Sequence, residues 1–202
     1  MTTKKNITVS TPYDDVFRTL LNDCTSLIIP VLNEVFGEHF TGDEEIIFAP
    51  NEHFLNQQDG EEDRRITDSS FKIRGAEEKS FLCECQSTSD SSMLVRIFEY
   101  ATQIALDQGE IVGNRLKVEI PHSALLFLRS NRNMPDRMEI EMSTSGGTVC
   151  FEVPVMKVQK YTINEIFAKK LLFLIPFYIF SHENRFDEYN KDTDKLEQLK
   201  RE

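Results

Sequence analysis

Three polar residues in two neighbouring strand-like segments have the types and spacing of a divalent-metal site. In the segment FLCECQ, the two-residue period of a β-strand sends Glu84 and Gln86 to one face, about 7 Å apart. Asp68 lies in an earlier strand-like segment, far enough away in the sequence for a hairpin to bring it beside Glu84. Two adjacent carboxylates raise each other's pKa unless a cation lies between them. Because Mg²⁺ takes oxygen ligands, often one or two carboxylates plus water, we predict Mg²⁺ (or Mn²⁺) bound by Asp68 and Glu84.

The same residues also have a purely structural interpretation. Asp68 can be a turn or helix-capping residue, and Glu84 an exposed charge on a strand. The isolated pattern of an aspartate followed by Glu-x-Gln occurs by chance in many acidic chains. Its strength here comes from its setting on two adjacent strands followed by a capped helix.

The other face of the FLCECQ strand is apolar. It carries Phe81, Cys83 and Cys85, which we expect in the core. With Cys24 and Cys150 the chain has four cysteines, and no second Cys or His pair stands at zinc-ligand spacing. We therefore interpret the cysteines as small buried hydrophobic residues of a reducing cytoplasm.

The residues after this strand predict a helix of about four turns. Ser89 to Ser92 form a cluster of helix N-capping residues, and the helix MLVRIFEYATQIALDQG is expected to end at Gly109. The helical period predicts four core positions, Leu94, Phe98, Ala101 and Ala105.

A polar stripe on the same helix can serve the site. It contains Arg96, Glu99 and Gln103, with Tyr100 beside them. One interpretation turns the stripe towards the acidic pair, where Arg96 contacts a phosphate or steadies Glu84. The other is a solvated helix face with a Glu/Arg pair.

These motifs resemble a known family. Asp68, a turn, Glu84-Cys85-Gln86 and the polar-faced helix are similar to the core of the PD-(D/E)XK nuclease superfamily, in which the two carboxylates hold a metal that activates water. More narrowly, RITDSSFKI, FLCECQST and MLVRIFEYATQIAL resemble the Rpn-type family of recombination-promoting nucleases and transposases, over residues 13–180. The resemblance implies an α/β, restriction-endonuclease-like fold, with a mixed central sheet flanked by helices, and mobile-element ancestry.

The sequence departs from the superfamily pattern at two positions. Thr67 stands where the motif has proline, and Gln86 stands where lysine is usual. The lysine supplies positive charge near the attacking water, so another cation, Arg96 or Lys72, or a second metal ion is expected to replace it. A basic rim around Asp68 would support a nuclease, and its candidate residues are Lys72, Arg74, Lys79 and Arg96.

The remaining segments predict a mixed sheet with helices on its faces. Residues 13–37 are expected to form two helices, with Pro30 at the break or in the first turn of the second, and Gly37 is a candidate C-cap. Residues 51–65 are interpreted as a polar, acidic connection. The other expected elements are strands at 44–50, 64–73 and 123–130, a hairpin of 138–143 and 148–158, and a helix at 163–180.

Length and charge limit the range of functions. The 202 residues suit one domain, 1–202, and we expect a longer full-length chain because the charged helical pattern DKLEQLKRE stops at the C-terminus. The net charge of −11 is the reverse of a general nucleic-acid binder, so DNA contacts must use a local basic patch or bound cations. The start lacks a signal peptide and LLFLIPFYIF is too short to span a bilayer, so a cytoplasmic protein is expected, with no membrane partner.

Two functions follow from these observations. The first is a Mg²⁺-dependent DNA endonuclease-like domain, a hydrolase of transposase type, with Asp68, Glu84, Gln86 and Arg96 at its site and DNA as partner. The second is a catalytically silent domain of the same fold whose acidic surface serves protein interaction, as expected from the charge and the missing lysine. A homodimer is left open in both cases.

Overall fold

The computed structural model describes residues 12–48, 52–56, 62–66, 69–86, 92–129 and 133–201, with the backbone alone for 12, 14, 52–56, 62–66, 69 and 198. The helices are α1 (Pro12–Asp23), η1 (Thr25–Leu27), α2 (Ile28–Phe36), α3 (Met93–Asp107), η2 (Val158–Lys160), α4 (Ile163–Ala168), η3 (Leu172–Ser181), η4 (Glu183–Arg185), α5 (Phe186–Tyr189) and α6 (Thr193–Arg201), where η denotes a 3₁₀ helix. The strands are β1 (Glu45–Phe48), β2 (Glu52–Asn56), β3 (Glu62–Ile66), β4 (Ser69–Arg74), β5 (Glu78–Gln86), β6 (Glu110–Val112), β7 (Arg115–Lys117), β8 (His122–Phe127), β9 (Arg137–Thr144) and β10 (Gly147–Lys157).

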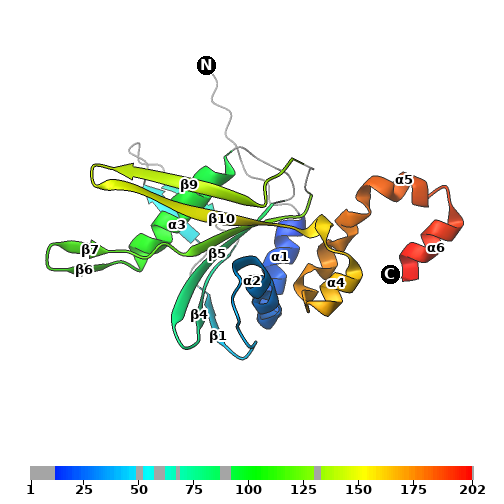
Figure 1. Cartoon of the computed structure of the whole chain (residues 1–202), viewed down its shortest axis with the longest axis horizontal. Coiled ribbons are helices and arrows are strands. Elements are labelled where there is room, and N and C mark those ends of the chain that lie inside the picture. The colour runs from blue at the N-terminus through cyan, green and yellow to red at the C-terminus, as the bar shows by residue number, and fades with distance from the viewer. Residues whose placement is uncertain are drawn as a thin grey trace, which may run out of the picture.

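A six-stranded mixed sheet organises the protein, in the order β1-β4-β5-β8-β10-β9 (Figure 1). Strands β1, β4 and β5 are antiparallel neighbours, and β9 is antiparallel to β10. The three central strands β5, β8 and β10 are parallel, and α3 forms part of the connection from β5 to β8. The chain is thus a mixed α/β protein with helices on both faces of its sheet, as the sequence predicts at this level.

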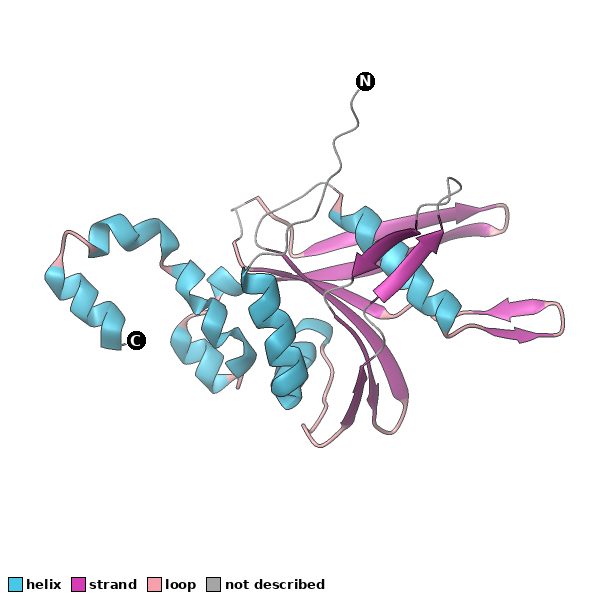
Figure 2. Cartoon of the chain, turned by 180° about the vertical axis from the view of Figure 1, so that it is seen from behind, coloured by secondary structure: helices cyan, strands magenta, loops and turns pink. Residues whose placement is uncertain are grey.

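Side-chain alternation divides the core into two layers. The face covered by α1, α2 and η3 includes Phe71, Phe81, Cys83, Cys85, Leu126 and Met156. The opposite face, covered by α3, includes Leu82, Leu125, Phe127, Val153 and Val155 (Figure 2). The predicted alternation of Phe81, Cys83 and Cys85 against Leu82 is confirmed. Cys24 and Cys150, however, are exposed, so the prediction of buried cysteines fails for those two.

The N-terminal segment forms two helices, as predicted. The turn of η1 separates α1 from α2, and Pro30 is the third residue of α2, where its missing N–H has no intrahelical role. Gly37 caps α2 in the left-handed conformation, with φ 68°, and its N–H donates to the Asn33 carbonyl at 3.0 Å.

The segment predicted as a polar connection contains strands instead. Strands β2 and β3 pair antiparallel, with Glu52 opposite Ile66 and Asn56 opposite Glu62. The stretch 64–73, predicted as one strand, therefore divides between β3 and β4. Backbone hydrogen bonds form a ladder irrespective of side-chain polarity, and this is why composition misjudged the segment.

The C-terminal helical stretch is also divided. The helix predicted over 163–180 ends at Ala168; Lys170 then takes a left-handed φ of 57°, and the chain continues as the 3₁₀ helix η3. Pro176 lies inside η3, and a proline at that point would remove a hydrogen bond from a continuous α-helix. A capping box at Thr162 and Glu165 fixes the start of α4.

Helix α3 follows its predicted span but is rotated from its predicted phase. Its buried residues are Met93, Ile97, Tyr100, Ala101, Ile104 and Ala105. Ala101 and Ala105 were predicted correctly, whereas Leu94 and Phe98 are only partly buried and Tyr100 belongs to the core. Ser92 is the N-cap residue, without a side-chain capping bond.

Two hairpins, β9–β10 of the six-stranded sheet and the separate β6–β7, extend to the left in Figure 1. The β9–β10 hairpin agrees with the sequence prediction, while β6–β7, which follows α3, was not predicted because each strand has three residues. Its turn places Gly113 at φ 62°, a conformation that suits glycine. Ile111 and Leu116 face each other across it and are 78% and 55% exposed.

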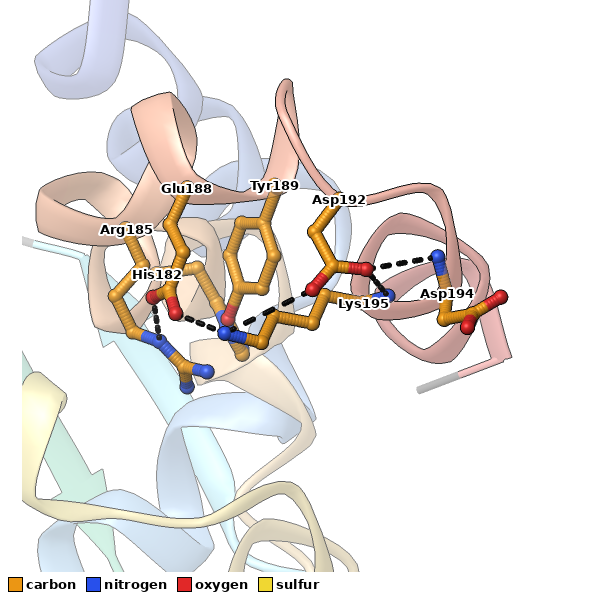
Figure 3. Close-up of polar contacts among 7 residues, drawn as sticks. All are labelled: His182, Arg185, Glu188, Tyr189, Asp192, Asp194 and Lys195. Carbon is orange, nitrogen blue, oxygen red and sulfur yellow. Dashed lines mark hydrogen bonds and ion pairs between the residues drawn. The ribbon is translucent and has the colours of Figure 1, made fainter.

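The C-terminal helices extend to the other side of the molecule. Buried His182 contacts the Tyr189 hydroxyl through Nδ1 at 2.9 Å, and Glu188 pairs with both Arg185 and Lys195 (Figure 3). Asp192 accepts hydrogen bonds from the backbone at the start of α6. No helix in the described part of the chain is long and apolar enough to cross a membrane.

Candidate metal-binding site

Glu84 and Gln86 lie at the carboxyl end of β5, the strand where the sheet changes from antiparallel to parallel pairing. Glu84 is opposite Leu125 and Gln86 is opposite Phe127 on the parallel strand β8. Alternation places both on the α3 face together with Leu82. Ligands of α/β proteins bind at the carboxyl ends of parallel strands, and these two side chains occupy that position.

Glu84 is 4% exposed and Gln86 is half-buried. The alternative in which Glu84 is an exposed strand charge is therefore wrong. Removing a carboxylate from water costs several kcal/mol unless hydrogen bonds, a proton or a cation compensate. Burial and, to a smaller extent, the charge of the adjacent Glu84 raise the pKa of the Cys83 thiol to about 12.

Asp68, the other predicted ligand, lies outside the described residues. Ser69, the next residue in the sequence, pairs with Cys83, and Ser70 pairs with Leu82. Ser69 and Cys83, the last described pair of the β4–β5 hairpin, are thus the sequence neighbours of Asp68 and Glu84.

Helix α3 brings Arg96 to the same face of the sheet. Arg96 lies in the first turn of α3 and is half-buried, with its Nε enclosed by protein. The helix packs on β5 and β9. Gln103 donates to Asp107 on the same helix at 2.8 Å.

Three of the four cations predicted for a basic rim, all except Arg96, form ion pairs elsewhere. Lys72 pairs with Glu78 at 2.7 Å, Arg74 pairs with Glu45 at 2.9 Å, and Lys79 pairs with Glu38 at 2.7 Å. These pairs lie towards the turn of the β4–β5 hairpin, away from the end of β5 that carries Gln86. Local ion pairing neutralises the three cations, and Lys72 is therefore a poor replacement for the missing lysine.

Arg129 follows β8 beside the backbone of Gln86, but its guanidinium lies against Tyr13 and Phe180, on the face of the sheet opposite to Glu84. The Leu128 N–H donates to the Gln86 carbonyl at 2.9 Å, so the chain leaving β8 passes directly beside the site. Arg129 follows, and its guanidinium makes two bonds to Glu183, at 2.5 and 2.6 Å. Sequence spacing gave no signal for this pair, because the two residues are 54 positions apart.

A buried lysine on the α3 face holds the chain at the start of β9. Lys157 is buried and donates to the Met134 carbonyl and to Asp136, at 2.7 Å from the latter, and Lys160 reaches the same Asp136 oxygen at 2.8 Å. The hydrogen bonds from Lys157 and Lys160 lower the pKa of Asp136 from 3.8 to about 2. This cluster anchors the segment that leads into β9.

The Asp136 cluster predicts an acid-dependent contribution to stability. A carboxyl group with a lowered folded-state pKa stabilises the fold above its unfolded pKa, and this stabilisation disappears as the pH falls through the folded value. The unfolding free-energy difference between wild type and Asp136→Asn should thus be greatest above about pH 4 and vanish towards about pH 2. Urea titrations across this range measure it, and a difference independent of pH would contradict the assignment.

Two other polar features lie away from the predicted residues. A pocket of about 320 Å³ between α2 and the β9–β10 hairpin is lined by charged residues that already form pairs, including Glu34 with Tyr161 and Arg137 with Glu152. Glu139, Glu141 and Cys150 form an exposed group on the β9–β10 hairpin with ligand atoms within 4.8 Å of one another. Exposed acidic groups of this kind are common without a metal.

No protein-family model, curated protein or solved structure matches the sequence. Inference about function therefore depends on the geometry of the site itself.

Proposed function

We propose that this chain is a Mg²⁺-dependent endonuclease-like domain of the PD-(D/E)XK superfamily, acting on DNA. The observation that supports this most is the burial of Glu84, on the same face as Gln86, at the carboxyl end of the strand where parallel pairing begins. The antiparallel β4–β5 pair followed by α3 and a parallel β8 agrees with the restriction-endonuclease-like arrangement that the motifs imply.

The donor atoms suit the proposed metal. Glu84 offers hard carboxylate oxygens, and Asp68 would supply a second carboxylate. Mn²⁺ accepts the same set. A bound Mg²⁺ would supply an acidified water and positive charge for the phosphoryl oxygens.

Each side chain of the site would then have a separate role. Glu84 and Asp68 would hold the metal, while the Gln86 carboxamide, which both donates and accepts hydrogen bonds, would orient water. Arg96 on α3 would steady this face of the site. The carboxamide carries no charge, so Arg96 or a second metal ion would have to balance the charge on the phosphate.

A supercoiled plasmid incubated with Mg²⁺ or Mn²⁺ tests the proposal. Wild-type protein should nick it, and Asp68→Asn should be inactive because the metal loses a charged ligand. Equal cleavage by the two proteins would show that any activity comes from a contaminant.

A specific observation favours the second candidate, an interaction module. Ile111 and Leu116 expose an apolar pair on the β6–β7 hairpin, and exposed apolar patches often mark protein contacts. A silent module would leave the plasmid intact with either metal, and the nicking assay therefore separates the two functions.

A further inference from the structure

The β6–β7 hairpin is an arm that no other element covers in the part of the chain that the structure describes. Its two strands form a sheet of their own, and all residues from 110 to 119 are exposed. Ile111 and Leu116 face each other across the arm, and Val118 continues their apolar face. A two-stranded hairpin alone is at best marginally stable in water, so this arm would be stabilised by a surface that covers it.

Strand β7 of the arm carries two cations on the face opposite to Leu116. Arg115 and Lys117 flank this leucine in the sequence, and the two-residue period of a strand turns both to the same side. Both are exposed, and neither forms an ion pair with another described residue. The strand therefore presents an unneutralised basic face and an apolar face.

Strand β9 presents the reverse pattern at the edge of the six-stranded sheet. It is the last strand of the sheet, so one side of its backbone pairs with no described strand. Glu139 and Glu141 are exposed on one face, with no cation paired to either among the described residues. Ile140, between them, is half-buried against the core layer under α3. A free strand edge of this kind can accept a further strand.

The two strands are complementary residue by residue. Residues 115–117 are basic, apolar and basic, and residues 139–141 are acidic, apolar and acidic. When Leu116 lies beside Ile140, both cations lie beside carboxylates on one face, and Leu116 extends the apolar layer on the other. Opposite charges and apolar side chains on neighbouring strands stabilise a sheet. Within one chain, however, β7 and β9 belong to separate sheets.

We propose that the β6–β7 arm of one molecule adds to the β9 edge of a second copy of this chain. Both hairpins extend to the same side of the molecule (Figure 1), so a two-fold axis at that side makes the contact twice and closes a dimer. The net charge of −11 makes two copies repel each other as a whole, and the arm brings local positive charge against an acidic strand. The proposal is independent of nuclease activity, because none of these residues belongs to the candidate metal site.

Analytical ultracentrifugation over a range of protein concentrations measures the dimer. Wild type should dimerise, whereas the arm variant, Arg115→Glu with Lys117→Glu, should dimerise at least about tenfold more weakly, because each attraction becomes a repulsion. The edge variant, Glu139→Lys with Glu141→Lys, should be weakened in the same way. An equimolar mixture of the two variants should recover dimers, since the altered arm then meets the altered edge and the natural arm meets the natural edge.

Lys170→Glu combined with Lys191→Glu is the matched control. It changes the net charge as much as the arm variant does, at two exposed lysines of the C-terminal helical region, on the other side of the molecule. This control should dimerise like wild type. Circular dichroism during heating confirms that each variant is folded.

Three results would overturn the proposal. Wild type that stays monomeric at every concentration would leave the arm to a different protein, and chains of growing length would exclude the two-fold contact. An arm variant that dimerises as tightly as the lysine control would exclude the basic face of β7 from the contact. Failure of the mixed variants to recover dimers would show that the arm and the β9 edge do not meet.

Discussion

Glu84→Gln should lower Mg²⁺-dependent DNA cleavage by at least about a hundredfold while the protein stays folded. Loss of a partner outside the first coordination sphere already costs about 10–100-fold in metal sites, and Glu84 is a proposed direct ligand. Glutamine keeps the size of the side chain and removes a buried charge, a change that leaves packing intact. Single-turnover cleavage at fixed Mg²⁺ and salt measures the effect.

Glu77→Gln is the matched control for this experiment. Glu77 is an exposed residue in the turn between β4 and β5, at the end of the hairpin away from Gln86. The Glu77→Gln substitution removes the same charge from the same hairpin, and the cleavage rate of this variant should stay close to that of wild type. Equal rates for Glu84→Gln and Glu77→Gln would exclude Glu84 from the catalytic machinery.

Phe81→Ala should destabilise the protein by about 3–5 kcal/mol, the usual range for a fully buried phenylalanine. Phe81 is completely buried, and its ring centre lies 5.3 Å from that of Phe36, 6.0 Å from those of Phe40 and Phe71, and 5.4 Å from that of His122. Its removal would leave a cavity where α2 meets β4 and β5. Urea unfolding of wild type and variant gives the difference.

Phe167→Ala serves as the comparison, because this phenylalanine is 57% exposed on α4. Surface substitutions of this kind usually change stability by less than about 0.5 kcal/mol. A similar loss for the two variants would show that the Phe81 cluster is not the centre of the core.

The sequence predicted those parts of the fold that depend on strand alternation. FLCECQ carries its apolar and polar residues at alternate positions, and the structure separates Phe81 and Cys83 from Leu82 and Glu84 accordingly. The helical phase of α3 was harder, since apolar residues surround most of the helix. Leu94 and Phe98 fit one stripe and Ile97 and Ile104 another, and packing on the sheet selected the second.

For the candidate site too, the sequence predicted contacts within one strand but not contacts between distant segments. Glu84 and Gln86 were visible because they share one strand face, two residues apart. The sequence did not predict the ion pairs of Lys72, Arg74 and Lys79, because neighbouring strands and loops supply the carboxylates. Arg129 meets Glu183 only after the sheet and the C-terminal helices have packed, and no sequence period reports such a contact.

Calorimetric titration of Mg²⁺ into wild type, Asp68→Asn, Glu84→Gln and Glu77→Gln is the most direct test of the central claim, that two carboxylates hold a divalent cation at the end of β5. Wild type and Glu77→Gln should bind one ion with the same affinity. Asp68→Asn and Glu84→Gln should each lose measurable binding, because each removes one of the charged ligands. Equal Mg²⁺ binding by all four proteins, or binding by none, would contradict the metal site.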